Sequence, residues 1–449
     1  MELRDYQKQD IQRIRAVTKL GLFSEQRTGK TPTAVVAVSE NLTQKVLVIC
    51  PASLMYNWSS EFKVWTGRTS VVVDKMTTDY QGSNVVIVNY EKLANTKTHK
   101  GLVDDLIKYK FDWLIVDEAH RIKNRQAAVS KAVIKLAHKI PNRLAITGTP
   151  AHDKPEDVFN ILRFIDYNTF TSYYRFIEEW CEMENVYTPR GVVNKPAGIL
   201  PKKKLEFAKL LDEHYGIMHK RNEVMDWDTE QDVIDIRLPL TPKQKHYLDE
   251  LLNYFETKDE NTEVITQGVL DRITRYRQIC NAPGILELSG NSPKIDWIVR
   301  YLKEYPDNSV IIFSNSRKFL NLLEDKISCP VLRIDGTISK QLRKSNVDTF
   351  QRGECKVMLI QTQAGKEGLT LDRADTTIFC DVFPPSSDYL QAKDRAVASR
   401  PEMVKPKTVF RLMMDDSYDE QLYVLVDKNI KQSAVINNFI EYIRRYDNE

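Results

Sequence analysis

Residues 113–124 read WLIVDEAHRIKN, an apolar run of strand length that passes directly into two adjacent acidic residues. Such a run predicts a buried strand that ends at the edge of a sheet. Upstream, residues 24–31 read SEQRTGKT, a glycine and lysine loop that precedes a stretch of helical length. Lys30 and Asp117 lie 87 residues apart, and we place both at strand ends of one domain. Nucleotide hydrolysis needs this combination, because a lysine must hold the phosphates while a carboxylate holds Mg²⁺.

Length and composition indicate a globular chain with more than one core. Its 449 residues suffice for about three units of ordinary domain size. With 42% hydrophobic and 28% charged residues, it has the balance of soluble proteins. No run approaches the roughly 18 consecutive apolar residues of a membrane span, and the N-terminal MELRDYQKQD lacks an apolar signal region. We therefore expect neither a membrane partner nor secretion.

The cysteines and the net charge limit the possible ligands. The cysteines are scattered without a CxxC pair, which suits free thiols in a reducing, cytoplasmic compartment and argues against a zinc site. The net charge of +3 is too small to indicate a nucleic-acid partner, so such a partner would need a local basic groove. The cysteines are Cys50, Cys181, Cys280, Cys329, Cys355 and Cys380.

Two sets of short apolar runs predict two parallel sheets. Runs that are apolar on both faces, with helical stretches between them, are typical of buried strands in an α/β fold. We expect one α/β domain over 1–165, a mainly helical insert over 166–290, and a second α/β domain over 291–449 that ends in a helix. Within the insert, residues 241–256 have helical spacing, and the lysine run at 201–204 is expected in a loop. The apolar runs are 45–50, 70–74, 84–90, 113–119 and 143–150, and then 309–315, 331–335, 356–362, 376–381 and 407–414.

The loop SEQRTGKT has the residue types that cradle phosphates. Gly29 lets the backbone approach the phosphates, Lys30 can reach the β- and γ-phosphates, and Thr31 can offer its hydroxyl to Mg²⁺. Pro32 then falls in the first turn of a helix, where its missing N–H costs nothing. A strict phosphate loop has glycine where Ser24 stands. The alternative is a chance GKT sequence at the start of a helix.

The DEAH sequence at 117–120 supplies the acids. Asp117 is placed to hold Mg²⁺, and Glu118 to orient or deprotonate the attacking water. His120 can relay the nucleotide state to other motifs. The alternative is a solvated acidic turn that caps a strand, but four specified residues after a buried strand favour the catalytic interpretation.

Further motifs follow in an order that resembles one family. The chain resembles the motor of superfamily 2 helicases, and within that group the SWI/SNF-type DNA translocases with a DEAH box, in particular compact phage-encoded enzymes that move forks and four-way junctions. The matches cover nearly the whole chain, and their order is more specific than any single motif. They are LRDYQ (3–7), CPASLMYNW (50–58), VNYEKL (88–93), DEAHRIKN (117–124), LAITGTP (144–150), KPEDVFNILRFI (154–165), RQICNAPGIL (277–286), IIFSNSRKFLNLLE (311–324), IDGTISKQLR (334–343), QTQAGKEGLTL (361–371) and QAKDRA (391–396).

The resemblance implies two RecA-like motor domains that bind ATP and Mg²⁺ in the cleft between them. By this similarity Gln7 reads adenine, while Thr147 and Thr149 couple hydrolysis to DNA contact. Thr31 and Asp117 are the implied ligands of the metal. The implied ATP-binding residues are Arg4, Gln7, Thr28, Gly29, Lys30, Thr31 and Gly368.

The resemblance also implies a DNA partner, either a duplex, a fork or a four-way junction, in the cytoplasm of a bacterial or phage-infected cell. The family moves along one strand of a duplex, usually 3′ to 5′. Contacts to phosphates suit such movement because they carry no sequence information. Each candidate contact could equally be a capping or surface residue. The candidates are Ser53, Asn89, Lys123, Thr337, Thr362 and Lys366.

The last motif departs from the family pattern, which has two arginines three positions apart. Here Arg395 is present, Ala398 stands at the second position, and Arg400 follows two residues later. A cation is needed because the transition-state charge spreads over the phosphoryl oxygens, an effect worth up to about 10³ to 10⁵ in rate. We expect Arg395 to supply this cation with help from Arg400. The expected catalytic residues are therefore Lys30, Asp117, Glu118, Arg395 and Arg400.

Two further groups have a structural interpretation that is more frequent than a DNA-binding role. Tyr173, Tyr174, Phe176 and Trp180 could stack on bases, but aromatic residues at this spacing usually form a helix core. The lysines at 202–204 could hold a phosphate backbone, but a lysine run is usually a solvated loop.

Three functions agree with these features. The first is an ATP-driven translocase or helicase on duplex or branched DNA, active in branch migration or fork remodelling during replication, recombination or repair. The second is an RNA helicase of the DEAH type. The third is a nucleotide-dependent DNA clamp with weak hydrolysis, to which the departures at Ser24 and Ala398 point.

Overall fold

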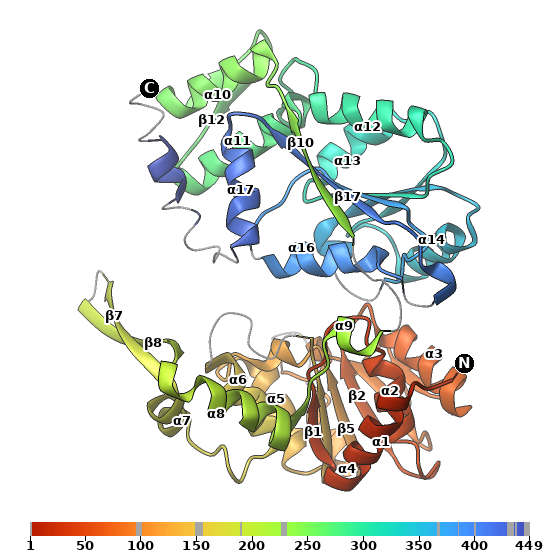
Figure 1. The fold of residues 1–449 in the computed structure, drawn as a ribbon. Helices are drawn as coiled ribbons and strands as arrows, with labels where there is room; N and C mark the ends of the chain where they lie inside the picture. The colour runs from red at the N-terminus through yellow and green to blue at the C-terminus, as the bar shows by residue number, and fades with distance from the viewer. Residues whose placement is uncertain are drawn as a thin grey trace. The chain divides into compact units, whose positions relative to one another are not determined.

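The chain folds into two compact units, Met1–Asp226 and Trp227–Glu449, and each is described by itself (Figure 1). The structure is a computed structural model. No helix in the part of the chain that it describes is long and apolar enough to cross a bilayer. The described residues are 2–95, 101–148, 156–188, 191–225, 231–365, 369–384, 386–398, 401–428, 435 and 438–443.

A parallel sheet of seven strands forms the centre of unit 1. Its order is β3-β4-β2-β5-β6-β1-β9, and every neighbouring pair is parallel. The α/β fold predicted from the apolar runs is therefore confirmed, with β5 in the middle of the sheet. The strands are β1 (Lys19–Leu22), β2 (Val46–Cys50), β3 (Val71–Val73), β4 (Val85–Asn89), β5 (Trp113–Asp117), β6 (Asn142–Ile146) and β9 (Gly216–Ile217).

Alternate residues of these strands enter two different cores. In β2, Leu47 and Ile49 pack into one core, while Val48 and Cys50 pack into the other. Because successive strand residues point to opposite faces, a sheet covered on both faces needs runs that are apolar throughout. The core with Val48 includes residues of α1 (Asp5–Val17), α2 (Lys30–Ala37) and α3 (Met55–Thr66). The core with Leu47 includes residues of α4 (Val103–Lys108), α5 (Ala128–Ala137) and α6 (Glu156–Ile165).

Unit 2 contains a second parallel sheet, of six strands in the order β10-β17-β16-β13-β15-β14. It too is covered on both faces by helices, as the apolar runs predicted. The strands are β10 (Asp232–Leu238), β13 (Val310–Ser314), β14 (Val331–Ile334), β15 (Val357–Gln361), β16 (Thr376–Phe379) and β17 (Thr408–Met414). The helices are α10 (Pro242–Tyr254), α11 (Val269–Asn281), α12 (Pro293–Glu304), α13 (Arg317–Glu324), α14 (Lys340–Arg352), α15 (Thr362–Gly365), α16 (Ser386–Lys393) and α17 (Tyr418–Asp427).

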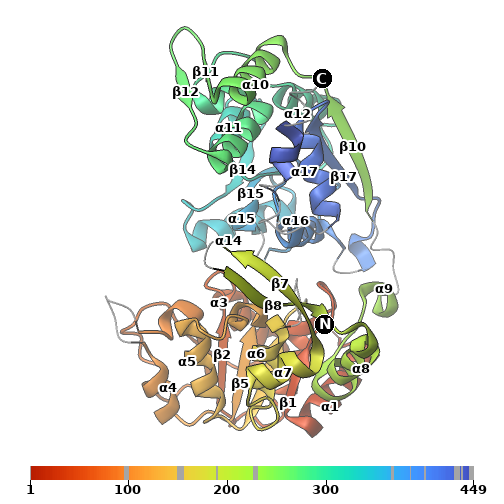
Figure 2. The ribbon, with the colours of Figure 1, turned by 90° about the vertical axis from the view of Figure 1, so that its left-hand side faces the viewer.

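The interval 166–290 differs from the mainly helical insert that was expected. Its first part belongs to unit 1 and its second part to unit 2. After α7 (Tyr173–Trp180), the chain forms an antiparallel hairpin of β7 (Cys181–Thr188) and β8 (Gly191–Ile199), which extends beyond the helices of unit 1 (Figures 1 and 2). Gly191 has a φ of 116°, which favours glycine and lets the chain reverse. The helical prediction was therefore wrong for this segment and for β10.

Apart from the 13-residue helices α10 and α11, the remaining elements of this interval are short. The lysine run expected in a loop instead forms a 3₁₀ turn (Pro201–Lys203) that leads into α8 (Lys204–Lys209). A proline at the first helical position explains the start of this turn, because its fixed φ suits a helix and its missing donor is not needed there. The other elements are α9 (Arg221–Val224) and the strand pair β11 (Glu256–Lys258) and β12 (Glu263–Ile265).

A buried ion pair organises the core of unit 2. The Lys294 ammonium donates to the Asp419 carboxylate at 2.6 Å, to the Asn281 side chain at 2.9 Å and to the Cys380 carbonyl at 2.7 Å. Both charged side chains are buried, with 0% and 1% exposure. The four groups belong to α12, α17, α11 and the end of β16. One ammonium group therefore joins four parts of the chain that are far apart in sequence.

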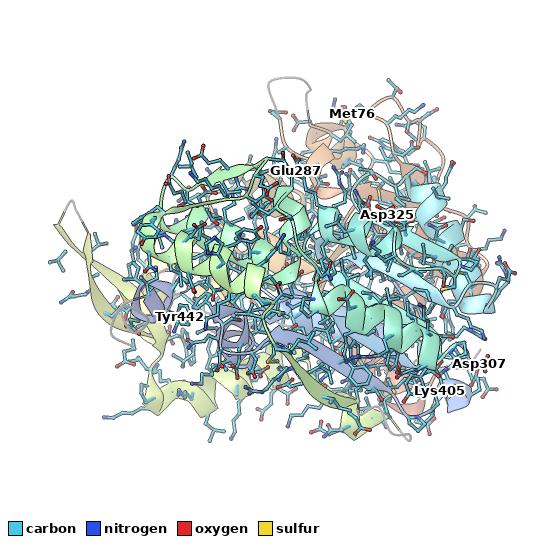
Figure 3. All side chains as sticks on the ribbon, turned by 90° about the horizontal axis from the view of Figure 1, so that it is seen from above. Met76, Glu287, Asp307, Asp325, Lys405 and Tyr442 are labelled. Atoms are coloured by element: carbon cyan, nitrogen blue, oxygen red, sulfur yellow. The ribbon has the colours of Figure 1, made fainter. Side chains whose placement is uncertain are left out.

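We predict that Lys294→Ala lowers the free energy of unfolding by about 3 to 5 kcal/mol, because it leaves the Asp419 carboxylate buried without its counter-ion. Urea denaturation followed by circular dichroism measures this change. The matched control is Lys356→Ala, whose ammonium lies 2.8 Å from the Asp307 carboxylate. Asp307 lies at the surface, where Figure 3 labels it. An exposed pair contributes only about 0 to 1 kcal/mol. Equal shifts of the denaturation midpoint in the two variants would contradict the organising role of Lys294.

Candidate nucleotide site

The carboxyl ends of β1, β2, β4, β5 and β6 lie at one edge of the unit 1 sheet, because all of these strands are parallel. Ligands of open parallel sheets bind at this edge, outside the carboxyl ends of the strands. Asn89 ends β4, and the segments that follow the other strands include the phosphate loop, Ser53, Glu118 and Thr147. The topology therefore brings the predicted site residues of unit 1 to a common edge.

The phosphate loop ends at Gly29, which caps α2 with a φ of 73° in the left-handed region. Lys30 is the first residue of α2, and its ammonium donates to the carbonyl oxygens of Ser24 at 2.7 Å and Glu25 at 2.8 Å. A Cβ added to Gly148, after β6, would lie 3.8 Å from the same ammonium. Lys30 is thus held across the mouth of the loop, next to the segment after β6.

Gln7, the residue expected to read adenine, contacts the phosphate loop directly. Its side-chain amide donates to the Gly29 carbonyl and to the Thr33 hydroxyl, both at 3.2 Å, and it accepts from the Arg4 backbone at 2.9 Å. The neighbouring Tyr6 hydroxyl donates to the Thr28 carbonyl at 2.6 Å. The start of α1 and the phosphate loop therefore form one hydrogen-bonded structure, while the contact of Gln7 with adenine stays a prediction.

Asp117 and Glu118 lie where the central strand ends. Asp117 is buried, and its carboxylate accepts from the Trp58 indole at 2.8 Å and from the Glu118 backbone at 2.9 Å. Burial, followed by the charge of Glu118, raises the pKa of Asp117 to about 7. Glu118 has a φ of 52°, a left-handed conformation that turns the chain sharply after the strand, and the Tyr90 hydroxyl donates to the Asp117 carbonyl. Such strained residues cluster at functional sites.

His120 connects these acids to the segment after β6. Its Nδ1 atom lies 3.2 Å from the Glu118 carboxylate and 3.2 Å from the Thr147 hydroxyl. Thr147 in turn is joined to β1, because its backbone donates to the Leu22 carbonyl at 3.1 Å. The predicted relay residue therefore bridges the two motifs in this structure.

The donor set fits ATP with Mg²⁺. Magnesium in such sites takes one or two carboxylates and hydroxyls together with substrate phosphates, so it needs no dedicated cage. Among the described residues, no group of three or more His, Cys, Asp or Glu side chains could hold a metal alone. The raised pKa of Asp117 marks a buried carboxylate that a bound cation would stabilise in its charged form. Thr31 and Asp117 remain the residues that would hold the metal.

A segment from the far end of unit 1 supports the phosphate loop. The His219 backbone donates to the Ser24 hydroxyl at 3.1 Å, and the Glu25 backbone donates to the His219 carbonyl at 2.9 Å. The His219 ring lies 2.9 Å from the Asp10 carboxylate, and this hydrogen bond raises the pKa of His219. The Ser24 hydroxyl also donates to the Ile217 carbonyl at 3.3 Å. Serine in place of glycine therefore has a structural role in this chain.

The sequence contains no pattern that identifies several of these residues as part of the site. β9 has only two residues, so no apolar period marks it or the His219 that follows. Trp58 and Tyr90 lie within segments that match the family motifs, yet their hydrogen bonds to Asp117 depend on strands that only the folded sheet brings together.

The predicted DNA contacts of unit 1 lie at the same edge of the sheet. Two of them, Asn89 and Lys123, also bind other side chains of the protein. Ser53 lies in the turn after β2. Asn89, the last residue of β4, donates to the Glu91 carboxylate at 2.8 Å and accepts from Lys92 at 3.0 Å. Lys123 forms a 3.2 Å ion pair with Asp157. Their roles toward DNA stay predictions.

Two of the predicted site residues of unit 2, Thr337 and Thr362, follow the ends of β14 and β15. The Thr337 hydroxyl donates to Asp335 at 2.6 Å, and Thr362 is the first residue of α15. The Arg395 guanidinium donates to the Leu369 carbonyl at 3.3 Å. The position of Arg395 relative to Lys30 is not determined, so its role as the catalytic cation stays a prediction. Thr149, Lys366, Gly368 and Arg400 lie outside the described residues.

Helix α7 confirms the core interpretation for only part of its aromatic residues. Phe176 and Trp180 are buried and pack in the core of unit 1. Tyr174 is 71% exposed, and the Arg125 guanidinium lies 4.2 Å from the ring centroid of Tyr173 and 5.7 Å from that of Tyr174. An arginine and an exposed tyrosine therefore lie together at the end of α7 that is remote from the hairpin.

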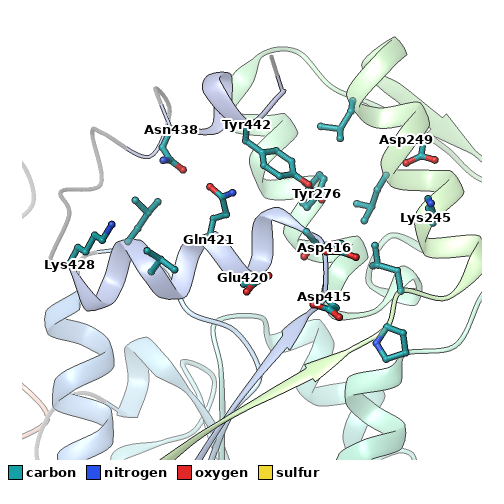
Figure 4. A pocket seen from close by; sticks show the side chains of 17 residues that line it. Lys245, Asp249, Tyr276, Asp415, Asp416, Glu420, Gln421, Lys428, Asn438 and Tyr442 are labelled. Atoms are coloured by element: carbon teal, nitrogen blue, oxygen red, sulfur yellow. Dashed lines mark hydrogen bonds between the residues drawn. The ribbon is translucent and has the colours of Figure 1, made fainter. Parts of the chain in front are cut away.

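A groove of about 1210 Å³ in unit 2 lacks the chemistry of a nucleotide site. It lies beside α10, α11 and α17, and Figure 4 shows the side chains that line it. Carboxylates outnumber ammonium groups among its lining residues, and an excess of negative charge repels phosphates. The carboxylates are those of Asp249, Asp415, Asp416 and Glu420, and the ammonium groups are those of Lys245 and Lys428.

The two parallel sheets and the phosphate loop beside an acidic strand end define a nucleotide-hydrolysing motor of the phosphate-loop class. A model of the SNF2-related domain family matches residues 7–285, and a model of the helicase conserved C-terminal domain matches residues 293–399. The chain belongs to the SNF2-related family. The predicted superfamily 2 ATPase with SWI/SNF-like motor domains is thereby confirmed, while the likeness to phage branch-migration enzymes stays a prediction.

Curated relatives are similar across the chain but are much longer. The Mus musculus SWI/SNF-related matrix-associated actin-dependent regulator of chromatin subfamily A member 1 is 25% identical over 97% of this chain and 43% of its own length. ISW2, the ISWI chromatin-remodeling complex ATPase of Saccharomyces cerevisiae, is 27% identical over 94% of this chain and 40% of its own. This chain thus spans less than half the length of these relatives. The Sulfolobus solfataricus SWI2/SNF2 ATPase core in complex with dsDNA is 22% identical, with a TM-score of 0.45 over 97% of this chain and 93% of its own.

We predict that Gly29→Ala raises the KM for ATP by about tenfold or more. A Cβ at Gly29 would lie 2.5 Å from the Gln7 side-chain nitrogen, so Gln7 or the loop must shift. The matched control is Gly67→Ala, which has a similar φ of 70° but no atom within 4 Å of the added Cβ. Both variants are expected to lose about 1 to 2 kcal/mol of stability from the left-handed conformation. Steady-state kinetics measures the effect on ATP binding, and thermal denaturation measures the effect on stability. An unchanged KM in Gly29→Ala would contradict the assignment of residues 24–31 as the phosphate loop.

We further predict that Trp58→Phe lowers kcat for ATP by about tenfold, because it removes a hydrogen bond to the Asp117 carboxylate while it keeps an aromatic ring in the core. The matched control on the same helix is Trp65→Phe, which removes a 2.9 Å hydrogen bond to the Glu61 carboxylate. We expect that control to keep the kcat of the unaltered protein. If the two variants turn over ATP at equal rates, Trp58 does not position Asp117 for catalysis.

Proposed function

We propose that this chain is an ATP-driven translocase that acts on duplex or branched DNA. The single observation that carries the proposal is the joining of three motifs at one sheet edge. Lys30 lies in the phosphate loop beside Gly148, and Asp117 and Glu118 end the central strand, with His120 bridging to Thr147. Membership of the SNF2-related family supports the choice of DNA as the track.

The residues of unit 1 divide the chemistry between them. When bound, ATP with Mg²⁺ supplies the phosphoryl group and the cation that neutralises it. Lys30, now bonded to two backbone carbonyls, can exchange these partners for phosphate oxygens without moving far. Glu118, on a sharp turn after the strand, is placed to accept the proton of the attacking water. Asp117 is fixed for the metal by Trp58 and Tyr90.

The bridge from Glu118 through His120 to Thr147 gives hydrolysis a route to the rest of the motor. Hydrolysis changes the charge beside Glu118, and His120 can redistribute its hydrogen bonds between the carboxylate and the Thr147 hydroxyl. Thr147 is anchored to β1, directly before the phosphate loop. Through this bridge, the nucleotide state can affect the strand ends where Ser53, Asn89 and Lys123 lie, and no further structural element is needed.

Action at forks and four-way junctions, in branch migration or fork remodelling in a bacterial or phage-infected cytoplasm, is the finer part of the proposal. It is supported by the ordered motifs in the sequence and by the projecting hairpin of unit 1. The names of the curated relatives connect those proteins with chromatin, which makes nucleosomal DNA a second track to compare.

We predict that ATP hydrolysis is stimulated more by forks and four-way junctions than by linear duplex. Steady-state rates are measured without nucleic acid and then with single-stranded DNA, duplex, fork, four-way junction, nucleosomal DNA and RNA, at matched nucleotide concentration and fixed salt, since phosphate contacts depend on salt. Glu118→Gln serves as the inactive control, with turnover expected to fall by about 10² to 10⁴ while ATP still binds.

Each alternative has its own outcome in this measurement. Stimulation by RNA and not by DNA would establish an RNA helicase of the DEAH type. ATP binding without turnover on any nucleic acid would establish a nucleotide-dependent clamp, and Ala398→Arg would then be the change expected to restore hydrolysis. Equal stimulation by linear duplex and junctions would remove the preference for branched DNA but keep the translocase.

A further inference from the structure

The hairpin β7–β8 is anchored to the core of unit 1 at its root. Trp180 and Cys181 at its root are buried in the core of unit 1, and the Leu200 backbone donates to the Trp180 carbonyl at 2.9 Å, which closes the root. Beyond the root, every described residue from 182 to 185 and from 191 to 195 is exposed. A two-stranded ribbon with neither face buried is only marginally stable in water, so its exposed length suggests a role outside the core.

The two faces of the hairpin differ in chemistry. The register pairs Met183 with Pro196 and Asn185 with Asn194. Because side chains alternate along a strand, these residues share one face with Val192. The opposite face carries Glu184 paired with Lys195, together with Val193. The first face therefore has apolar groups and amides but no charge among its described residues.

An uncharged face of this kind suits unpaired DNA bases. Apolar side chains insert between base steps, and amides form hydrogen bonds with base edges. Val192 is 56% exposed and Met183 40% exposed, so both are accessible for such contacts. No carboxylate on the described part of this face would repel a nucleic-acid strand.

Lysines lie near the root of the same hairpin, together with the exposed carboxylates of Glu178, Glu179, Glu182 and Glu206. Lys202 and Lys204 are exposed directly after β8, and the Lys203 ammonium lies 4.8 Å from the ring centroid of Trp180. Lysines of this kind bind phosphates without reading sequence. A strand whose backbone is held at the root would therefore present its bases to the ribbon. The proposed function, not the local charge, favours DNA over a protein partner.

We propose that β7–β8 is the element that separates the strands of a DNA fork, with the face of Met183 and Val192 placed against the unpaired bases and the lysines at 202–204 on the backbone. The inference rests on the proposed function, because the motor must drive the fork onto the hairpin. It adds to that function a physical means of unwinding. Translocation along a duplex alone does not require this element.

Two adjacent valines provide a matched test. Val192→Asp places a carboxylate on the face toward the bases, while Val193→Asp places the same group on the opposite face, where the native side chain is 42% exposed. A third variant joins Met183 to Pro196, which are paired in the register, through an Asn-Gly turn, and so removes the exposed ribbon while it keeps the root. Circular dichroism and thermal denaturation verify that all three variants are folded.

Two assays on the full chain separate strand separation from translocation. Separation of a forked duplex measures the first, and displacement of a third strand from a triplex measures the second. We expect Val192→Asp to slow fork separation by about tenfold or more, which corresponds to the loss of one good contact, while ATPase stimulation and triplex displacement stay within about twofold. Val193→Asp should behave as the unaltered chain. The shortened variant should displace the third strand but leave forks intact.

The outcomes distinguish this inference from the function on which it rests. If the unaltered chain displaces the third strand but separates no fork, or if the shortened variant separates forks normally, the hairpin is not a separating element and the translocase stands. Equal losses in the two valine variants would likewise overturn the inference, and the ribbon would then be a candidate for docking a protein. Absence of any DNA-stimulated ATPase activity would overturn both proposals.

Discussion

The burial of Asp117 at the end of the central strand is the constraint that organises unit 1. A carboxylate can be buried there only if donors are supplied, and these are the Trp58 indole of α3 and the Glu118 backbone N–H, while the Tyr90 hydroxyl donates to the Asp117 backbone carbonyl. The same requirement places His120 against Thr147 and thereby connects β5 with β6. The residues expected to perform the chemistry at this sheet edge are therefore held in place by the same contacts that stabilise the fold.

Unit 2 solves a similar problem with a different set of residues. Asp381, after β16, is buried and accepts hydrogen bonds from Asn281 at 2.8 Å, from Ser314 and from the backbone and side chain of Asn315. Asn281 also accepts from Lys294, which joins this acid to the buried ion pair with Asp419. Networks in which the members are satisfied favour one arrangement of strands and helices over the alternatives. Each unit thus fixes the ends of its parallel strands with a buried acid.

The sequence was sufficient for the features that depend on local pattern. Strands such as β2 and β5, apolar on both faces, appear as runs, and the phosphate loop and DEAH sequence appear as motifs. Elements that depend on distant partners escaped prediction. β9 is too short to show a period, β10 adds to the edge of a sheet far along the chain, and the hairpin buries neither face. The support of Ser24 by Ile217 and His219 could be found only in the folded structure.

The hydrogen bond between His219 and Ser24 has a consequence for the synthesis of the protein on the ribosome. These two residues lie 195 positions apart, so the phosphate loop leaves the ribosome long before the strand that completes its support. At roughly 5 to 20 residues per second, the loop waits about 10 to 40 s for β9. During that interval the sheet edge beside β1 is an open strand that can pair with other chains. A nascent motor would therefore acquire its ability to bind nucleotide only near the completion of unit 1.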